Sequence, residues 1–346
     1  NWLNHVGGSK SIFVNASTWG LMLTGYIVEL DNEIQSSTKS WLKQFSAKLG
    51  EPIIRKAIFK AMEIMANQYV LGQTIDDAIS AKTKKSLFSF DMLGEGSRTE
   101  SDSINYFEAY SDAIKRIGRF SAPEKSVEEN DGISVKLSAL HNRYEFRHES
   151  TVMKKLYQRI KKLCLEAKTF NISLSLDAEE SARLDLAMQI FENLSREPEL
   201  NGWDGLGFVL QSYLKRAPLV LKWLDALASE TNQKFMIRLV KGAYWDTEIK
   251  RAQEKGLKEY PVYTRKVNTD ACYHYCTHLL SLNQGTLYPQ FATHNAYTMA
   301  LIAEIFKNQN FEFQRLHGMG VALFDEMQRV YLPSLKARVY APVGDH

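Results

Sequence analysis

The spacing of apolar residues along the chain changes near residue 80. Before that point apolar side chains recur at helical intervals, for example within 53–65, without strand-like alternation. From residue 87 onward, short apolar or alternating runs are separated by segments of helical character such as 151–170 and 179–194. There are eight such runs, at 87–93, 133–140, 172–178, 206–214, 234–245, 288–295, 311–318 and 337–344.

Strands that alternate with helices predict parallel pairing through crossover helices. A set of eight favours a closed (β/α)8 barrel of the TIM type over an open sheet. A doubly wound sheet is the alternative, and the absence of a GxGxxG turn after the first strand counts against it. We therefore predict an α/β fold with a helical accessory region at 1–80 and a barrel at 81–346.

Composition narrows the class of protein. The 346 residues are 45% hydrophobic and 24% charged with a net charge of +3, which argues against disorder and against a strongly basic nucleic-acid binder. Three cysteines without a secretory segment favour a reducing compartment. No run approaches the roughly 20 apolar residues that span a bilayer. We expect a soluble, cytoplasmic fragment of a longer protein that binds no nucleic acid.

Polar residues inside the apolar runs gather toward the C-terminal end of each run. In a barrel of this kind the C-terminal strand ends and the following loops build the active site. One such residue is more often a satisfied polar group, but a set that converges on one mouth favours a pocket for an anionic ligand and a polar cofactor. The set comprises Asp91, Lys136, Asp177, Gln211, Arg238, Lys241, Thr293, His294 and His317.

The segment 238–245 (RLVKGAYW) carries the richest chemistry. Gly242 lets the backbone approach a ligand closely. Arg238 is able to donate a hydrogen bond to the ring edge of a flavin, and Tyr244 and Trp245 offer flat apolar faces.

Other chemistries lack support. Cys272, His274, Cys276 and His278 resemble a metal set, but on a helix the two cysteines face about 200° away from the histidines, so no metal is expected and core cysteines with surface histidines are the better interpretation. No GxSxG, HExxH or P-loop motif occurs.

Long motifs give the chain a family resemblance. It resembles the proline dehydrogenase domain of the bifunctional proline utilization A family, over essentially its whole length. The motifs are SVKLSALHNRYEF (134–146), LDAEE (176–180), QSYLKR (211–216), RLVKGAYWDTEIKRAQ (238–253), YPVYTRK (260–266), YPQFATHNA (288–296), FEFQRLHGMG (311–320) and YAPVG (340–344), with FVNASTWGLMLTG (13–25) and GEPIIRKAI (50–58) in the helical region.

The resemblance implies a distorted barrel with FAD at the C-terminal ends of its strands. The implied reaction is hydride transfer from C5 of L-proline to flavin N5, which gives Δ1-pyrroline-5-carboxylate, the first step of proline catabolism. Reduced flavin would pass electrons to a membrane quinone, with peripheral contact on the inner face of the bacterial membrane. An aldehyde dehydrogenase domain is expected elsewhere in the parent chain.

Carried over by residue, the resemblance implies a catalytic set of Lys136, Asp177 and Arg238. The implied substrate-binding residues are Asp91, Lys136, Tyr244 and Tyr340, where Tyr340 would crowd C4 and disfavour hydroxyproline. The implied cofactor-binding residues are Asp177, Gln211, Arg238, Val240, Lys241, Gly242, Trp245, Thr264, Lys266, Thr293 and His294.

The chain departs from the family pattern at two places. Family members commonly have Pro where this chain has Asn142. An eighth helix with an Arg pair, which clamps the substrate carboxylate, follows YAPVG in the family and has no counterpart in residues 1–346. A flavin-binding barrel that cannot bind substrate is therefore the alternative to an active enzyme, and an interaction module in the helical region is a weaker one.

Overall fold

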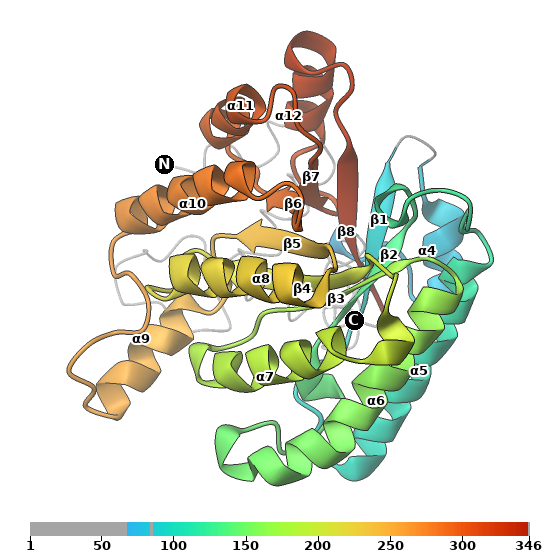
Figure 1. Ribbon diagram of the computed structural model, residues 1–346, viewed down its shortest axis with the longest axis vertical. Helices are drawn as coiled ribbons and strands as arrows, with labels where there is room; N and C mark the ends of the chain where they lie inside the picture. The colour runs from blue at the N-terminus through green and yellow to red at the C-terminus, as the bar shows by residue number, and fades with distance from the viewer. Residues whose placement is uncertain (1–67, 84–85, 345–346) are drawn as a thin grey trace, which may run out of the picture. The chain divides into compact units, whose positions relative to one another are not determined.

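Eight parallel strands close into a barrel in the computed structural model, which describes residues 68–83 and 86–344. Each strand pairs with the next along the chain, and β8 closes the ring against β1 (Figure 1). The strands are β1 Leu87–Met92, β2 Gly132–Val135, β3 Ser173–Leu176, β4 Leu206–Gln211, β5 Phe235–Val240, β6 Leu287–Ala292, β7 Glu312–Leu316 and β8 Ala337–Val343. The predicted (β/α)8 barrel is confirmed, and the first residue of each strand lies within one position of the predicted one.

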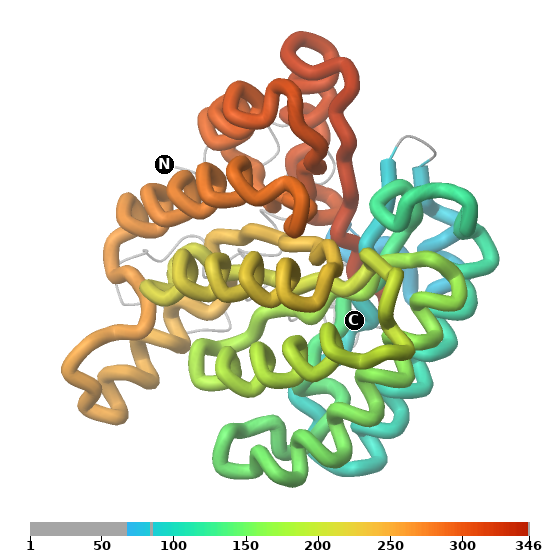
Figure 2. Tube along the Cα trace, viewed as in Figure 1, coloured from blue at the N-terminus to red at the C-terminus, as the bar shows by residue number. Residues whose placement is uncertain are grey.

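Helix α4 precedes β1, the other helices follow strands β1 to β7, and together they surround the barrel, as the trace in Figure 2 shows. They are α4 Ile75–Ala81, α5 Glu100–Gly118, α6 Glu149–Thr169, α7 Leu184–Ser195, α8 Ala217–Thr231, α9 Trp245–Glu254, α10 Lys266–Leu282, α11 Ala296–Ile305 and α12 Val321–Glu326. Short 3-10 turns lie at Val127–Glu129, Leu137–Ala139, Phe146–His148, Ser181–Arg183 and Pro198–Leu200, and a π-helical turn at Met327–Tyr331. None of the helices in this part of the chain is long and apolar enough to cross a membrane.

Local sequence explains how these elements begin and pack. Thr99 caps α5 in a capping box with Asp102, which satisfies backbone N–H groups at the first turn. Every residue of β4 is buried, because α8 covers its outer face and the barrel core its inner face. The wall between β6, β7 and their helices is aromatic: Phe291, Phe306, Phe311 and Phe313 pack with ring centroids 5.0 to 6.4 Å apart.

The proposed division of the chain at residue 80 stays a prediction. Most of the predicted helical region 1–80 lies outside the described residues. Within the described part, α4 belongs to the same compact unit as the barrel, because that unit begins at Leu71.

The N-terminal end of the barrel is closed by a buried ion pair. The Arg338 guanidinium donates to both oxygens of Glu312 at 2.7 and 3.0 Å, and each residue is 1% exposed. The same guanidinium donates to the carbonyls of Asn130 and Glu128 at 2.8 and 2.9 Å. Strands β7 and β8 are thereby tied to the segment before β2.

Candidate active site

A cavity of about 600 Å³ opens at the C-terminal ends of the strands. Most of the residues predicted for the site contribute to its wall: Lys136, Asp177, Gln211, Arg238, Val240, Lys241, Gly242, Tyr244, Lys266, Thr293, His294 and Tyr340. Residues that lie up to 204 positions apart in sequence are hydrogen-bonded there, so the strand-end residues do converge on one mouth.

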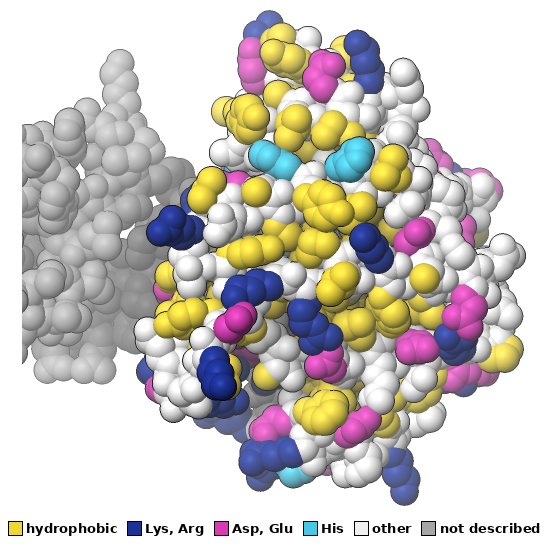
Figure 3. Space-filling view, turned by 60° about the vertical axis from the view of Figure 1, so that its left-hand side comes forward, with side chains coloured by type: hydrophobic (Ala, Val, Ile, Leu, Met, Phe, Trp, Pro, Cys, Tyr) yellow, Lys and Arg dark blue, Asp and Glu magenta, His cyan; other side chains and the backbone are white. Residues whose placement is uncertain are grey.

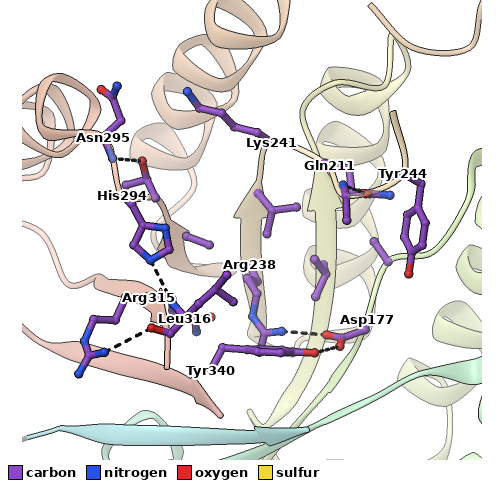
Figure 4. A pocket seen from close by; sticks show the side chains of 18 of the residues that line it. Asp177, Gln211, Arg238, Lys241, Tyr244, His294, Asn295, Arg315, Leu316 and Tyr340 are labelled. Carbon is purple, nitrogen blue, oxygen red and sulfur yellow. Dashed lines mark hydrogen bonds and ion pairs between the residues drawn. The ribbon is translucent and has the colours of Figure 1, made fainter. Parts of the chain in front are cut away.

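Arg238 lies at the centre of this cavity (Figure 4). Its side chain is almost fully buried, and its Nη1 donates to the Asp177 carboxylate at 2.8 Å. Its Nη2 crosses the barrel from β5 to the hydroxyls of Ser89 and Ser134, at 3.0 and 2.9 Å. The plane of the guanidinium is therefore fixed before any ligand binds, which lowers the entropy that binding costs.

Lys136 and Asp91 form a second buried pair beside Arg238. The Lys136 ammonium donates to Asp91 at 2.8 Å and lies 3.6 Å from Asp177. Burial alone would lower the pKa of Lys136, but the charges of Asp177 and Asp91 outweigh burial and raise it. Lys136 thus stays cationic at neutral pH and is able to bind an anion.

The Tyr340 hydroxyl joins the two carboxylates. Its oxygen lies 2.8 Å from Asp91 and 2.7 Å from Asp177, and it accepts from Lys136 at 3.3 Å. A hydroxyl has one hydrogen, so it donates to only one of the carboxylates. Burial raises the pKa of Asp91, with the nearby Asp177 charge adding to the rise and Lys136 opposing it. Asp91 is therefore the carboxyl best placed to hold a proton.

Gln211 and Tyr244 hold the loops around the cavity. The Gln211 amide donates to the Glu179 carbonyl at 2.9 Å and accepts from the Ala243 N–H at 3.1 Å. The Tyr244 hydroxyl, from the loop after β5, donates to Glu95, from the loop after β1, at 3.0 Å. Because β1 and β5 are opposite strands of the barrel, this bond spans its mouth.

Basic side chains line another part of the cavity. They are Lys241 after β5, Arg315 on β7 and Lys266 at the start of α10. Lys241 and Lys266 both donate to Asp270, the latter at 2.6 Å. His294 accepts from the Leu316 N–H at 3.1 Å, and Arg315 lies beyond it at the same end (Figure 4). On the face drawn in Figure 3, basic and acidic side chains are scattered among apolar ones.

Gly242 adopts a backbone conformation that L residues rarely accept, with φ of 139°. A Cβ at this position would meet the Tyr213 ring at 2.5 Å. We expect Gly242→Ala to lower the free energy of unfolding by about 1–3 kcal/mol, measured by urea denaturation. Gly256→Ala is the matched control, because its φ of 59° is also positive but nothing lies within 4 Å of its added Cβ. Equal losses in the two variants would contradict a role for the Tyr213 contact.

Four predicted residues do not line the cavity: Asp91, Trp245, Thr264 and His317, whose backbone N–H donates to the Tyr340 carbonyl at 2.9 Å. Asp91 lies beneath it and reaches it through Lys136 and Tyr340. Trp245 begins α9 with its ring 41% exposed and its indole N–H bonded to the Tyr263 carbonyl at 2.9 Å. Thr264 is exposed in the loop before α10. The structure thus gives no contact between the cavity and Trp245 or Thr264, and their cofactor roles stay predictions.

Sequence reasoning missed other contributors. Ser89 and Ser134 fix Arg238, and Asp270 pairs with both cavity lysines. Gln314 and Arg315 line the cavity, and their place in the FEFQRLHGMG strand could have marked them.

The cysteine and histidine group on α10 behaves as its helical spacing predicts. Cys272 and Cys276 are buried, His274 is half-buried and His278 is exposed. Within residues 68–83 and 86–344, no group of three or more His, Cys, Asp and Glu side chains is arranged to hold a metal ion.

Comparison with known proteins decides the family. A family model described as proline dehydrogenase matches residues 74–346, which is most of the chain. This chain belongs to the proline dehydrogenase family. The bifunctional protein PutA of Escherichia coli is 47% identical over 358 residues, and that of Rhizobium meliloti is 42% identical over 353. Both alignments cover the whole of this chain, but only 27% and 28% of those relatives, so the chain spans about a quarter of their length.

Solved structures agree with the family assignment. Proline utilization A of Bradyrhizobium japonicum, as a D779Y mutant, has a TM-score of 0.78 and 41% identity, covering 98% of this chain and 35% of that one. The Bdellovibrio bacteriovorus protein inactivated by N-propargylglycine has the same TM-score at 28% identity, covering 90% of this chain and 34% of that one. The predicted resemblance to the proline dehydrogenase domain of this family is confirmed.

A second family model matches the part of the chain before the barrel. It is described as the DNA-binding domain of proline dehydrogenase and covers residues 1–69. Nearly all of that match lies outside the described residues. The expectation that this chain binds no nucleic acid therefore gains no support, and the match points the other way.

Proposed function

We propose that this domain oxidises L-proline to Δ1-pyrroline-5-carboxylate with bound FAD. The observation that carries the proposal is the buried cluster of Lys136, Arg238, Asp177 and Tyr340 at the C-terminal strand ends. Its chemistry suits a small amino acid beside a redox ring, and the chain belongs to the proline dehydrogenase family.

The cavity fits a flavin. Its volume is in the range of about 300–1,000 Å³ that is usual for cofactor sites. The Arg238 Nε and the Gln314 Oε1 are buried without a hydrogen-bond partner, so a donor and an acceptor are left for a ligand. Gly242 lines the cavity, and its φ of 139° is one that L residues rarely adopt, so glycine is favoured at this point of the wall. The flavin, when bound, supplies the acceptor for the hydride from C5 of proline, at its N5.

The remaining work falls to side chains of this chain. Lys136 would bind the substrate carboxylate through a charge-assisted hydrogen bond. Tyr340 and Tyr244 would pack against the proline ring and exclude water from the reacting carbon. The substrate nitrogen has to be neutral for C5 to lose a hydride, and Asp91, Asp177 and Tyr340 form the buried acid–base group nearest to Lys136 that is able to hold its proton.

The proposal also includes the acceptor that takes the electrons from the reduced flavin. We propose a quinone as the final acceptor, reached by peripheral contact of a cytoplasmic protein with the inner face of the bacterial membrane. The PutA relatives are described as bifunctional, which supports an aldehyde dehydrogenase domain elsewhere in the parent chain.

An anaerobic visible spectrum before and after addition of L-proline tests the reaction. We expect flavin absorbance bands that bleach with L-proline and do not bleach with D-proline. Bands that stay unbleached would favour a barrel that binds flavin but not substrate. A colourless protein that takes up no added FAD would overturn the proposal.

A further inference from the structure

The cations that line the cavity differ in whether a carboxylate of the chain neutralises them. Lys136 is paired with Asp91 and Arg238 with Asp177, each at 2.8 Å. Each of these cations therefore has a carboxyl group of the protein beside it.

The two lysines at the other end share a single acid. Asp270 is the carboxylate partner of both Lys241 and Lys266, so this group keeps one excess positive charge. Asp270 has a lowered pKa, because these two lysines outweigh the opposing effect of its burial, and it remains ionised.

Arg315 is the cavity-lining cation without an acid partner within 4 Å in the described part of the chain. Its Nη1 reaches only the backbone carbonyls of Leu316 and Met319, at 3.3 and 3.4 Å, which are long hydrogen bonds. Burial lowers the pKa of Arg315, and the more distant Asp325 charge only partly offsets this. A half-buried guanidinium without an acid partner is well placed to bind an anionic ligand.

The neighbours of Arg315 do not supply that anion. Burial, and then the charge of Arg315, lower the pKa values of His294 and His317, so both rings are neutral at pH 7. Two of the cationic groups that line the cavity are therefore left without a full counter-charge from the described residues, the lysine pair and Arg315. A dinucleotide diphosphate carries one negative charge on each of its two phosphates, which balances them.

We propose that Arg315 binds the diphosphate of the flavin dinucleotide and so selects FAD over flavins that lack it. The inference rests on the proposed function, because it assumes that the cavity holds a flavin. Asp177, Gln211 and Tyr244 lie on one side of the cavity and Arg315, His294 and Asn295 on the other (Figure 4), so the ring would lie beside the first group and the phosphate chain beside the second.

Flavin titration of the apoprotein tests this without any turnover. We expect Arg315→Gln to weaken FAD binding about 10- to 100-fold, the usual size for one charge-assisted hydrogen bond. Riboflavin affinity should be unchanged in the variant, because riboflavin has no phosphate. Arg315→Lys should recover part of the FAD affinity. Arg329→Gln is the matched control, since Arg329 is exposed and pairs only with Glu326.

The outcomes separate the two proposals. An equal loss for FAD and riboflavin would show that Arg315 acts only by holding the Leu316–Met319 turn, and an unchanged FAD affinity would likewise overturn the inference. If the unmutated chain binds neither flavin, the proposed function fails and the inference with it.

Discussion

Lys136→Met should lower kcat/KM for L-proline by about 30- to 1,000-fold, the range expected when one member of a buried charge pair is removed. Lys136 is within 4 Å of both Asp91 and Asp177, at 2.8 and 3.6 Å. Methionine keeps the length of the side chain but removes the cation beside Asp91 and leaves Asp177 with Arg238 alone, so the site has one positive charge fewer to attract the carboxylate of the substrate. The loss should therefore fall mainly on KM, measured with an artificial electron acceptor.

Two controls test whether the loss of kcat/KM is specific to Lys136. Lys155→Met removes a lysine of α6 whose side chain is 53% exposed, and it should leave kcat/KM within about twofold. The flavin content of the Lys136→Met protein should equal that of the unmutated chain, because Lys136 contacts no residue of the phosphate end. A normal KM in a flavin-loaded variant would refute the proposed role of Lys136.

The barrel could be predicted because each of its strands is marked by a short stretch of neighbouring residues in the sequence. Each strand is a short apolar run, and each run carries a polar residue near its C-terminal end, as with Asp177 after β3 and Gln211 at the end of β4. The spacing of apolar residues and the place of each polar residue within its run were enough to predict that Lys136, Asp177 and Arg238 share one site. The runs were predicted one to five residues too long at their C-terminal ends, where polar residues of the following loops were included with the strands.

Long-range partners could not be predicted in the same way. Arg238 bonds to Ser89, which lies 149 positions earlier, and nothing in the sequence around a serine identifies such a partner. Trp245 was assigned to the cofactor by motif, but it begins α9 and its indole turns to the Tyr263 carbonyl. Arg315 was not among the predicted residues, and only the structure shows that it lines the cavity and which carboxylates are within its reach.

The second large effect is expected at the N-terminal end of the barrel, its floor, where Arg338 and Glu312 form a buried ion pair. Arg338→Met should lower the free energy of unfolding by about 3–5 kcal/mol, because it leaves the buried Glu312 carboxylate without its counter-charge. The double variant Arg338→Met/Glu312→Leu should recover part of that loss, since paired removal of a buried ion pair costs far less than removal of one member. Urea denaturation of both variants and of Arg329→Met, an exposed control, measures the difference.

The Arg338→Met substitution also tests whether the N-terminal end of the barrel is coupled to the active site at its C-terminal end. Arg338 lies two residues before Tyr340 on β8, yet its partners Glu312, Glu128 and Asn130 are at the N-terminal end, where side chains of this fold contribute stability rather than chemistry. Flavin-loaded Arg338→Met should therefore keep its kcat at a temperature where it is folded. A lowered kcat in the folded variant would show that the floor and the site are coupled, with Gln314 as the link, because it donates to Glu312 at 2.8 Å and also lines the cavity.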